Sequence, residues 1–316
     1  MTKIIDLKMD LPVSAQELAQ KIKFLIINKH ATGVANYRRI FGPRYASSMG
    51  MTIEDLENKA KELSSDEFDA LLVSLAAKVT QTPQEFIEQM DQSNIEWCLI
   101  DDPDNEKTYQ FIQHNPDRLK GSATINPHDG EEGLKKTEKA IREYGFKSIY
   151  TSAFLSKIEA SNSKNYPFYA KALEMGVPVF IYTTMNYSTE LPMDIGHPIH
   201  IDKIAMDFPD LKIVASCGGW PWVPDLVGIA RRHRNVYIDT SSHRPKYLAT
   251  QGSGFEMLLQ FGNTLLQDRI LFGSGIGDLG LKIQTIVEEI ESLPLKDEVK
   301  RKWFYNNAAT LFGMEQ

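Results

Sequence analysis

Cysteine is scarce in this sequence: only Cys98 and Cys217 carry a thiol among its 316 residues. Two cysteines are too few for a disulfide framework or for a cysteine-rich zinc site. We therefore expect both to be reduced thiols and the fold to depend on a hydrophobic core. The composition suits such a core, because 42% of the residues are hydrophobic and 24% are charged.

The sequence also lacks clusters of basic residues, and its N-terminus lacks a long apolar run. The formal net charge is −7, and no block of Lys and Arg is present to displace counterions from a nucleic acid. The first twenty residues contain Asp6, Asp10 and Glu17 and no continuous apolar run, unlike a signal peptide or a membrane anchor. We expect a cytoplasmic protein with no nucleic-acid or membrane partner.

From residue 93 onward, short runs rich in β-branched residues alternate with amphipathic stretches of helical length. This alternation is typical of βα units around a parallel sheet. The predicted strands are residues 3–8, 95–100, 119–125, 146–150, 178–182, 212–216, 236–239 and 270–272. Eight strands can close a barrel, and such barrels commonly have about 200 to more than 400 residues. The sequence predicts one α/β domain over residues 1–316, a (β/α)8 TIM barrel.

Helix ends support this prediction. Residues 166–175 are followed by Gly176 and then Pro178, which is a typical helix stop before a strand. Residues 134–144 end at Gly145 in the same way, and residues 200–208 end before Pro209. Each expected helix leads directly into a predicted strand.

Residues 11–92 separate the first predicted strand from the second and are too many for an ordinary connection. Thr52 with Asp55 three residues later resembles a capping box, and Leu56 and Leu63 recur at helical spacing. A loop that follows a barrel strand emerges at the end where barrel enzymes have their active sites. We predict a helical insertion that covers the barrel mouth.

The second half of the chain carries several motifs in a recognisable order. They are DFPDLKIV at 207–214, CGG at 217–219, RRHRNVYID at 231–239, ILFGS at 270–274 and YNNA at 305–308. In these motifs the chain resembles the amidohydrolase-related superfamily, in the branch with non-oxidative decarboxylases and with lactone or amide hydrolases. The resemblance is good over residues 93–316 and weak over residues 1–10, and the insertion carries none of it. It implies a homodimer that acts on a small-molecule carboxylate or lactone.

The resemblance also implies where a divalent metal would bind. The family places a His-x-His pair on the first strand, one His after each of the fifth and sixth strands, and an Asp after the eighth. Here these five positions hold Lys8, Asp10, Tyr182, Cys217 and Gly275. A lysine ammonium has no lone pair for a metal, and Asp10 with Cys217 falls short of an ordinary zinc site. We expect no metal and no other cofactor.

Lys8 allows two interpretations. Side chains alternate along a strand, so Asp6, Lys8 and Asp10 should share the interior face of the barrel. Lys8 is then either a buried ion-paired group without a function, or a single charge that replaces the metal and polarises a carbonyl or holds a carboxylate. In both cases we expect Asp10 or Asp6 to hold the ammonium. In the functional case Asp10 is a candidate catalytic base.

His243 and Arg244 follow the seventh predicted strand. Together they offer an acid–base group and a guanidinium fork for a substrate carboxylate, although a solvated loop pair explains them as well. Cys217 is either a nucleophile or an inert buried thiol, and the adjacent sequence supplies no His to activate it. Tyr182 and Cys217 replace metal ligands, so both are candidates for contact with the substrate.

Three further features have alternative explanations. Trp220 either packs at the base of its loop or contacts the substrate. Arg38, in the aromatic and basic stretch that runs from Tyr37 to Phe41 and includes Arg44, would suit an anionic planar ligand if the insertion folds over the mouth, or the stretch is an ordinary amphipathic helix. Asp101, Asp102 and Asp104 resemble a carboxylate cluster, but Pro103 among them favours a turn.

Three functions remain open. The first is a metal-independent hydrolase or lyase, lactonase-like or decarboxylase-like, acting on a small organic acid. The second is a catalytically inactive relative that binds a ligand or a partner, and a pocket filled by Tyr182 and Trp220 would favour it. The third is a metalloenzyme with relocated ligands such as Asp10, Cys217, His243 and Asp278. Fold alone does not decide among them.

Overall fold

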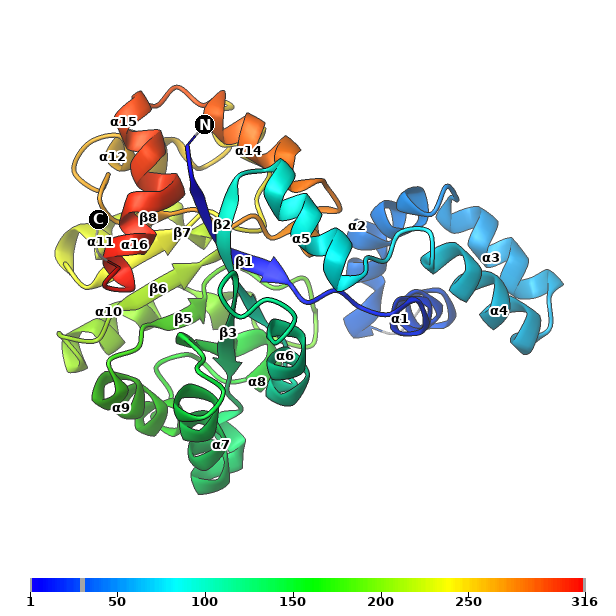
Figure 1. The fold of residues 1–316 in the computed structure, drawn as a ribbon, viewed down its shortest axis with the longest axis horizontal. Helices are drawn as coiled ribbons and strands as arrows, with labels where there is room; N and C mark the ends of the chain where they lie inside the picture. Colours follow the sequence, from blue (N-terminus) through cyan, green and yellow to red (C-terminus); the bar gives the residue numbers. More distant parts are fainter. Residues whose placement is uncertain (1, 29–31, 315–316) are drawn as a thin grey trace.

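Eight parallel strands form a nearly closed barrel in the computed structural model, which describes residues 2–28 and 32–314 (Figure 1). The strands are β1 (Ile4–Asp10), β2 (Ile95–Asp101), β3 (Leu119–Thr124), β4 (Ser148–Thr151), β5 (Val179–Tyr182), β6 (Ile213–Ser216), β7 (Val236–Asp239) and β8 (Ile270–Leu271). Each pairs in parallel with the next. The segment after β8 returns to β1, because Leu7 N donates to Phe272 O at 3.0 Å and Gly275 N to Lys8 O at 2.8 Å. The predicted (β/α)8 TIM barrel is confirmed.

Helices cover the outside of the barrel. They are α5 (Pro83–Gln92), α6 (Asn105–Ile112), α7 (Gly130–Arg142), α9 (Tyr166–Met175), α10 (Ile199–Asp207), α11 (Val223–Arg232), α12 (Glu256–Gly262), α14 (Ile283–Glu291), α15 (Asp297–Arg301) and α16 (Asn307–Leu311), with the short α8 (Ala153–Ser156) and α13 (Ile276–Leu279) near strand ends. The helix predicted from residue 134 begins earlier, at Gly130. Its first turn contains Glu131 and Glu132, acidic residues that favour a helix N-terminus and carry no apolar signal.

Successive strand residues belong to two different hydrophobic clusters, as expected for a barrel whose outer face is covered. The interior cluster includes Ile5, Leu7, Trp97, Leu99, Tyr150, Phe180, Val214 and Leu271. Their sequence neighbours Ile4, Cys98, Ile149, Ile181, Ala215 and Ile270 belong to the cluster under the helices. Large apolar side chains therefore fill the interior, and polar residues follow at the carboxyl ends of the strands.

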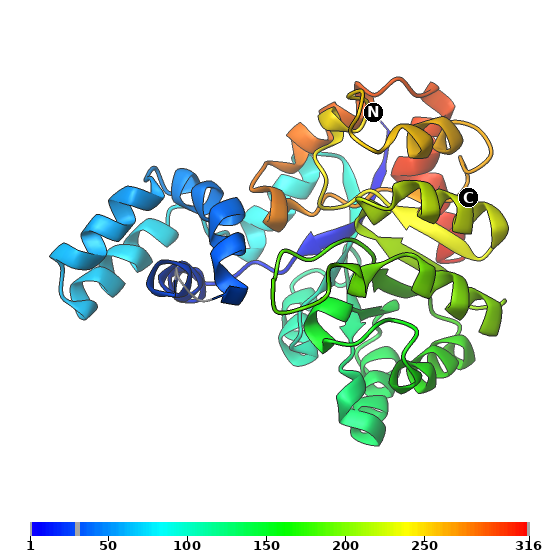
Figure 2. The ribbon, with the colours of Figure 1, turned by 180° about the vertical axis from the view of Figure 1, so that it is seen from behind.

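Four helices between β1 and α5 form a lobe to one side of the barrel, beyond the carboxyl end of β1 (Figures 1 and 2). They are α1 (Ala15–Ile27), α2 (Thr32–Ser48), α3 (Ile53–Glu62) and α4 (Ser65–Ala76). The lobe has its own core, with Ile22, Leu56, Phe68 and Leu72 buried together. Thr52 and Asp55 form the expected capping box of α3. Helix α5 instead packs against β2, as the first helix of the barrel wall.

No helix in the described ranges combines the length and apolar character needed to cross a membrane.

Candidate active site

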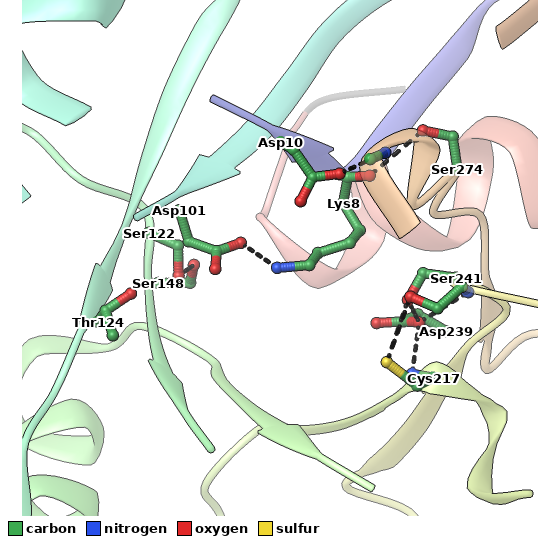
Figure 3. Close-up of polar contacts among 12 residues, drawn as sticks. Lys8, Asp10, Asp101, Ser122, Thr124, Ser148, Cys217, Asp239, Ser241 and Ser274 are labelled. Carbon is green, nitrogen blue, oxygen red and sulfur yellow. Dashed lines mark hydrogen bonds and ion pairs between the residues drawn. The ribbon is translucent and has the colours of Figure 1, made fainter. Parts of the chain in front are cut away.

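Lys8 lies at the carboxyl end of the barrel interior and forms an ion pair with Asp101 of β2. Figure 3 shows this ion pair, in which the Lys8 Nζ to Asp101 Oδ1 distance is 2.5 Å. The ammonium also lies 4.6 Å from the centre of the Tyr150 ring. Burial alone would lower the pKa of Lys8, but electrostatic interactions with Asp101, Tyr150 and Asp10 raise it well above its ordinary value. Lys8 is therefore a fixed cation. Both paired side chains are 13% exposed, so solvent still reaches them.

We predicted that Asp10 or Asp6 holds the Lys8 ammonium, and this prediction was wrong. A register shift between Asp6 and Met9 of β1 interrupts the alternation, so Asp6 does not share a face with Lys8. Asp6 Oδ1 instead accepts hydrogen bonds from the backbone N–H groups of Lys8 at 3.1 Å and Ser274 at 2.8 Å. Its complete burial raises the pKa of Asp6 to about 7. Asp10 accepts from Gly277 N at 2.8 Å and acts on Lys8 through its charge.

The sequence contained a signal for Asp101 that Pro103 obscured. Asp101 lies two and four residues after Leu99 and Trp97, which belong to the interior cluster. Alternation along β2 therefore places its carboxylate on the interior face. The turn that Pro103 favours begins only after the strand has ended at Asp101.

A cavity of about 480 Å³ lies at the barrel mouth, between helix α2 of the lobe and the loops that follow β5, β6 and β7. Four of the candidates from the sequence line it: Tyr182, Cys217, His243 and Arg244. Helix α2 contributes four lining residues from the aromatic and basic stretch that the sequence analysis considered for an anionic planar ligand: Tyr37, Ile40, Phe41 and Arg44.

Trp220 and Arg38 do not belong to the described lining of this cavity. The Trp220 indole N–H donates to Ser253 O at 3.2 Å, which fixes the ring at the base of its loop. Arg38 forms an ion pair with Glu57 of α3 inside the lobe. One helix position separates it from Tyr37, and that step of about 100° turns its side chain toward α3.

Asp239, which the sequence reasoning missed, joins the loops after β6 and β7. Its Oδ1 accepts from Cys217 N at 3.0 Å, from Ser241 N at 2.9 Å and from Ser241 Oγ at 2.5 Å (Figure 3). Cys217 adopts a left-handed backbone conformation, with φ of 66°. A fully buried carboxylate thus fixes the strained turn that presents Cys217 to the cavity.

His243 does not activate the Cys217 thiol. Its Nε2 lies 2.9 Å from the backbone oxygen of Cys217, so the ring donates its N–H to that carbonyl. Burial lowers the pKa of His243 to about 4, and the ring is neutral near neutral pH. The imidazole therefore supports the loop that carries Cys217, and its Nδ1 remains the acceptor of the neutral ring.

Arg244 is oriented by Glu289 of α14. Its Nε and Nη2 lie 2.8 and 2.7 Å from Glu289 Oε1, and the hydrogen bond with this carboxylate raises the pKa of the guanidinium. A guanidinium has five N–H groups, so donors remain for a second anion. Arg244 can therefore present donors to a carboxylate in the cavity.

The residues at the family's metal positions do not fit a divalent metal. Lys8 and Asp10 on β1, Tyr182 at the end of β5, Cys217 after β6 and Gly275 after β8 meet at the same end of the barrel. An ammonium, a phenol and a glycine replace three of the expected ligands. Within the part of the chain that the structure describes, no group of three or more His, Cys, Asp or Glu side chains could hold a metal ion. The alternative metal site considered from the sequence also included Asp278, whose side chain lies outside the described part of the structure.

Solved structures share this fold at low sequence identity. A TIM-barrel protein of Bordetella bronchiseptica is 22% identical with a TM-score of 0.68, and the alignment covers 98% of each chain. A 5-carboxyvanillate decarboxylase of Novosphingobium aromaticivorans, solved with manganese and a nitrobenzoic acid, is 14% identical with a TM-score of 0.64, covering 99% of this chain and 97% of that one. A 4-oxalomesaconate hydratase of Rhodopseudomonas palustris is 20% identical with a TM-score of 0.58, covering 98% and 95%. No curated protein matches the chain significantly.

The family profile described as amidohydrolase matches residues 55–314. The match begins inside the lobe, so the expectation that the insertion carries no resemblance was wrong for residues 55–92. It leaves out β1, where the first pair of metal ligands is replaced. Since the profile covers α3 to α16, more than half of the sequence, this chain belongs to the amidohydrolase family.

Proposed function

We propose that this chain is a metal-independent hydrolase or lyase that acts on a small organic acid at the barrel mouth. The observation that carries the proposal is the position of the Lys8 ammonium. Asp101 holds it at the carboxyl end of the barrel interior, at a sequence position where the family has a metal ligand. A fixed positive charge in a partly buried site stabilises negative charge that develops on a carbonyl or carboxylate oxygen. It is a single charge, so it stabilises less than a divalent ion does.

The cavity at the barrel mouth supports a carboxylate substrate, and Lys8 and Asp10 lie outside its described lining. Arg44 and Arg244 line it, and both carry donors that match a carboxylate. Aromatic rings of Tyr37, Phe41 and Tyr182 supply flat apolar walls. The 5-carboxyvanillate decarboxylase of similar fold was solved with a benzoic acid, which is consistent with this substrate class.

Asp10 is the base that this proposal requires. An ammonium does not lower the pKa of a bound water as zinc does, so a hydrolytic reaction needs a separate group to take the proton. Asp10 is partly exposed at the end of β1, and Gly277 N holds one of its oxygens. His243 suits the role less well, because its pKa is near 4 and its N–H is used by Cys217 O.

A catalytically inactive binding protein is the second candidate. The observation that favours it is the pairing of the cations: Lys8 already contacts Asp101, and Arg244 already contacts Glu289. Such a network holds a ligand without moving a proton. Against it, the cavity is open beside Tyr182, and Trp220 lies outside the described lining.

The test is turnover and binding after removal of metals. Purified protein dialysed against a chelator is assayed with lactones and with benzoic acids, alongside Lys8→Met, Lys8→Arg and the control Lys203→Met on an exposed face of α10. We expect turnover without added metal, loss of turnover in Lys8→Met although it remains folded at the assay temperature, and no effect of Lys203→Met. Binding that depends on Lys8 without turnover would favour the inactive candidate. Activity that returns only with added metal would refute metal independence.

A further inference from the structure

A second cavity of about 850 Å³ lies beside the mouth cavity, between α1 and α2 of the lobe and the segments around residues 154–157 and 188–191 of the barrel. Tyr37, Phe41 and Phe154 line both cavities. The two spaces are therefore adjacent and share one aromatic wall.

This shared wall is attached to both the lobe and the barrel. The Tyr37 ring centre lies 5.9 Å from that of Phe41 and 5.5 Å from that of Phe154. The backbone N–H of Tyr187, in the loop after β5, donates to the Tyr37 hydroxyl at 3.3 Å, and Asn36 Nδ2 donates to Tyr187 O at 3.1 Å. The lobe thus contributes to the boundary between the cavities and is held there by hydrogen bonds.

The two cavities differ in chemistry. The mouth cavity has the guanidinium groups of Arg44 and Arg244. The second is lined mainly by apolar side chains, of which Phe24 is 54% exposed and Leu155 is 53% exposed. Large apolar side chains gathered in a hollow at the surface mark a binding site more often than isolated ones do.

We propose that the second cavity binds the apolar tail of the substrate whose carboxylate lies in the mouth cavity. The inference rests on the proposed function and deepens it, because it names the substrate class: an amphipathic carboxylic acid with an extended hydrocarbon tail. Two observations carry it. The cavities adjoin at the wall of Tyr37, Phe41 and Phe154, and the cationic cavity contains Arg44 and Arg244 while the apolar one lies between barrel and lobe. A ligand that spans both has its charged end near Arg44 and Arg244 and covers Phe24 and Leu155.

The experiment measures affinity against tail length. Linear saturated acids from butanoate to dodecanoate, below their micelle concentrations, are titrated into the full chain by calorimetry. Once the tail passes the shared wall, each methylene that enters the apolar cavity should tighten binding by about 3- to 4-fold.

Two variants test the location. Phe24→Asp and Leu155→Asp place a charge at exposed positions of the apolar cavity, so we expect them to fold normally, to bind butanoate unchanged and to lose the dependence on tail length. The matched control is Leu265→Asp, which is 66% exposed and lines neither cavity. It should retain the full dependence. Arg244→Gln should weaken all acids by a similar factor.

The outcomes separate this inference from the proposed function. If short acids bind or react but affinity does not rise with tail length, the tail site is refuted and the proposed function stands. If no acid of any length binds or reacts, the proposed function fails, and the tail site fails with it. If Phe24→Asp and Leu155→Asp abolish a dimer instead, while tail length has no effect, the surface is an interface between two copies and the inference is overturned.

Discussion

The ion pair between Lys8 and Asp101 offers the most demanding test of the reasoning. Asp101→Asn keeps the shape of the side chain and removes its charge, leaving the Lys8 ammonium near Tyr150 and Asp10. Breaking a buried pair by removing one partner costs about 3 to 5 kcal/mol. Because both side chains are 13% exposed and Asp10 still faces the cation, we expect a loss just below that range, about 2 to 3 kcal/mol.

Chemical denaturation at neutral pH measures this loss, and a thermal scan should show a melting temperature lower by roughly 3 to 5 °C. The control is a double-mutant cycle with Lys8→Met, which removes the charge that Asp101 compensates. The double variant should be more stable than the sum of the single losses predicts, by about 1 to 3 kcal/mol. A change below about 0.5 kcal/mol in Asp101→Asn, or strictly additive losses, would show that the pair does not organise the barrel end.

Three further predictions concern buried groups around the site. The pKa of Asp6 is raised from 3.8 to about 7, so between these pH values the folded state holds a proton that the unfolded state releases. The free energy of unfolding should therefore fall as pH rises from 3.8 to about 7, by on the order of 4 kcal/mol. Asp6→Asn should remove this slope in urea titrations at several pH values. The pKa of His243 is lowered from 6.5 to about 4, so its contribution to folding stability is present above pH 6.5 and is lost as pH falls toward 4. His243→Gln should flatten this part of the stability–pH profile. An unchanged slope would contradict the burial of the ring. Cys217→Ser should keep most of the kcat/KM for any substrate found, because the His243 N–H binds the backbone oxygen of Cys217 and does not activate the thiol; complete loss of turnover would establish Cys217 as the nucleophile.

The barrel could be predicted because each strand carries its own signal. Residues 236–239 are a strand in the structure as predicted, and the helix at 166–175 ends at Gly176, which has the expected left-handed conformation with φ of 69°. Such signals depend on sequence neighbours alone, through the alternation of strands and the stop of a helix. The order of the barrel strands follows from them.

The contacts of the site could be predicted only in part. Tyr182, Cys217, His243 and Arg244 were found because strand ends of a parallel barrel converge. The partner of Lys8 was missed because the register shift in β1 depends on pairing with β2, which the local pattern does not contain. Likewise, the pattern of α2 shows an amphipathic helix but not which of its arginines faces the barrel.

Asp239 gives the barrel mouth a constraint on its evolution. In most barrels of this type each loop after a strand can change without its neighbours, and this independence lets one fold acquire many specificities. Here one oxygen of Asp239 accepts hydrogen bonds from Cys217 in the loop after β6 and from Ser241 in the loop after β7. A change in the backbone path of either loop would leave a buried carboxylate short of donors, so the backbones of these two loops can diverge only together, while exchanges of their side chains leave the N–H donors of Cys217 and Ser241 in place.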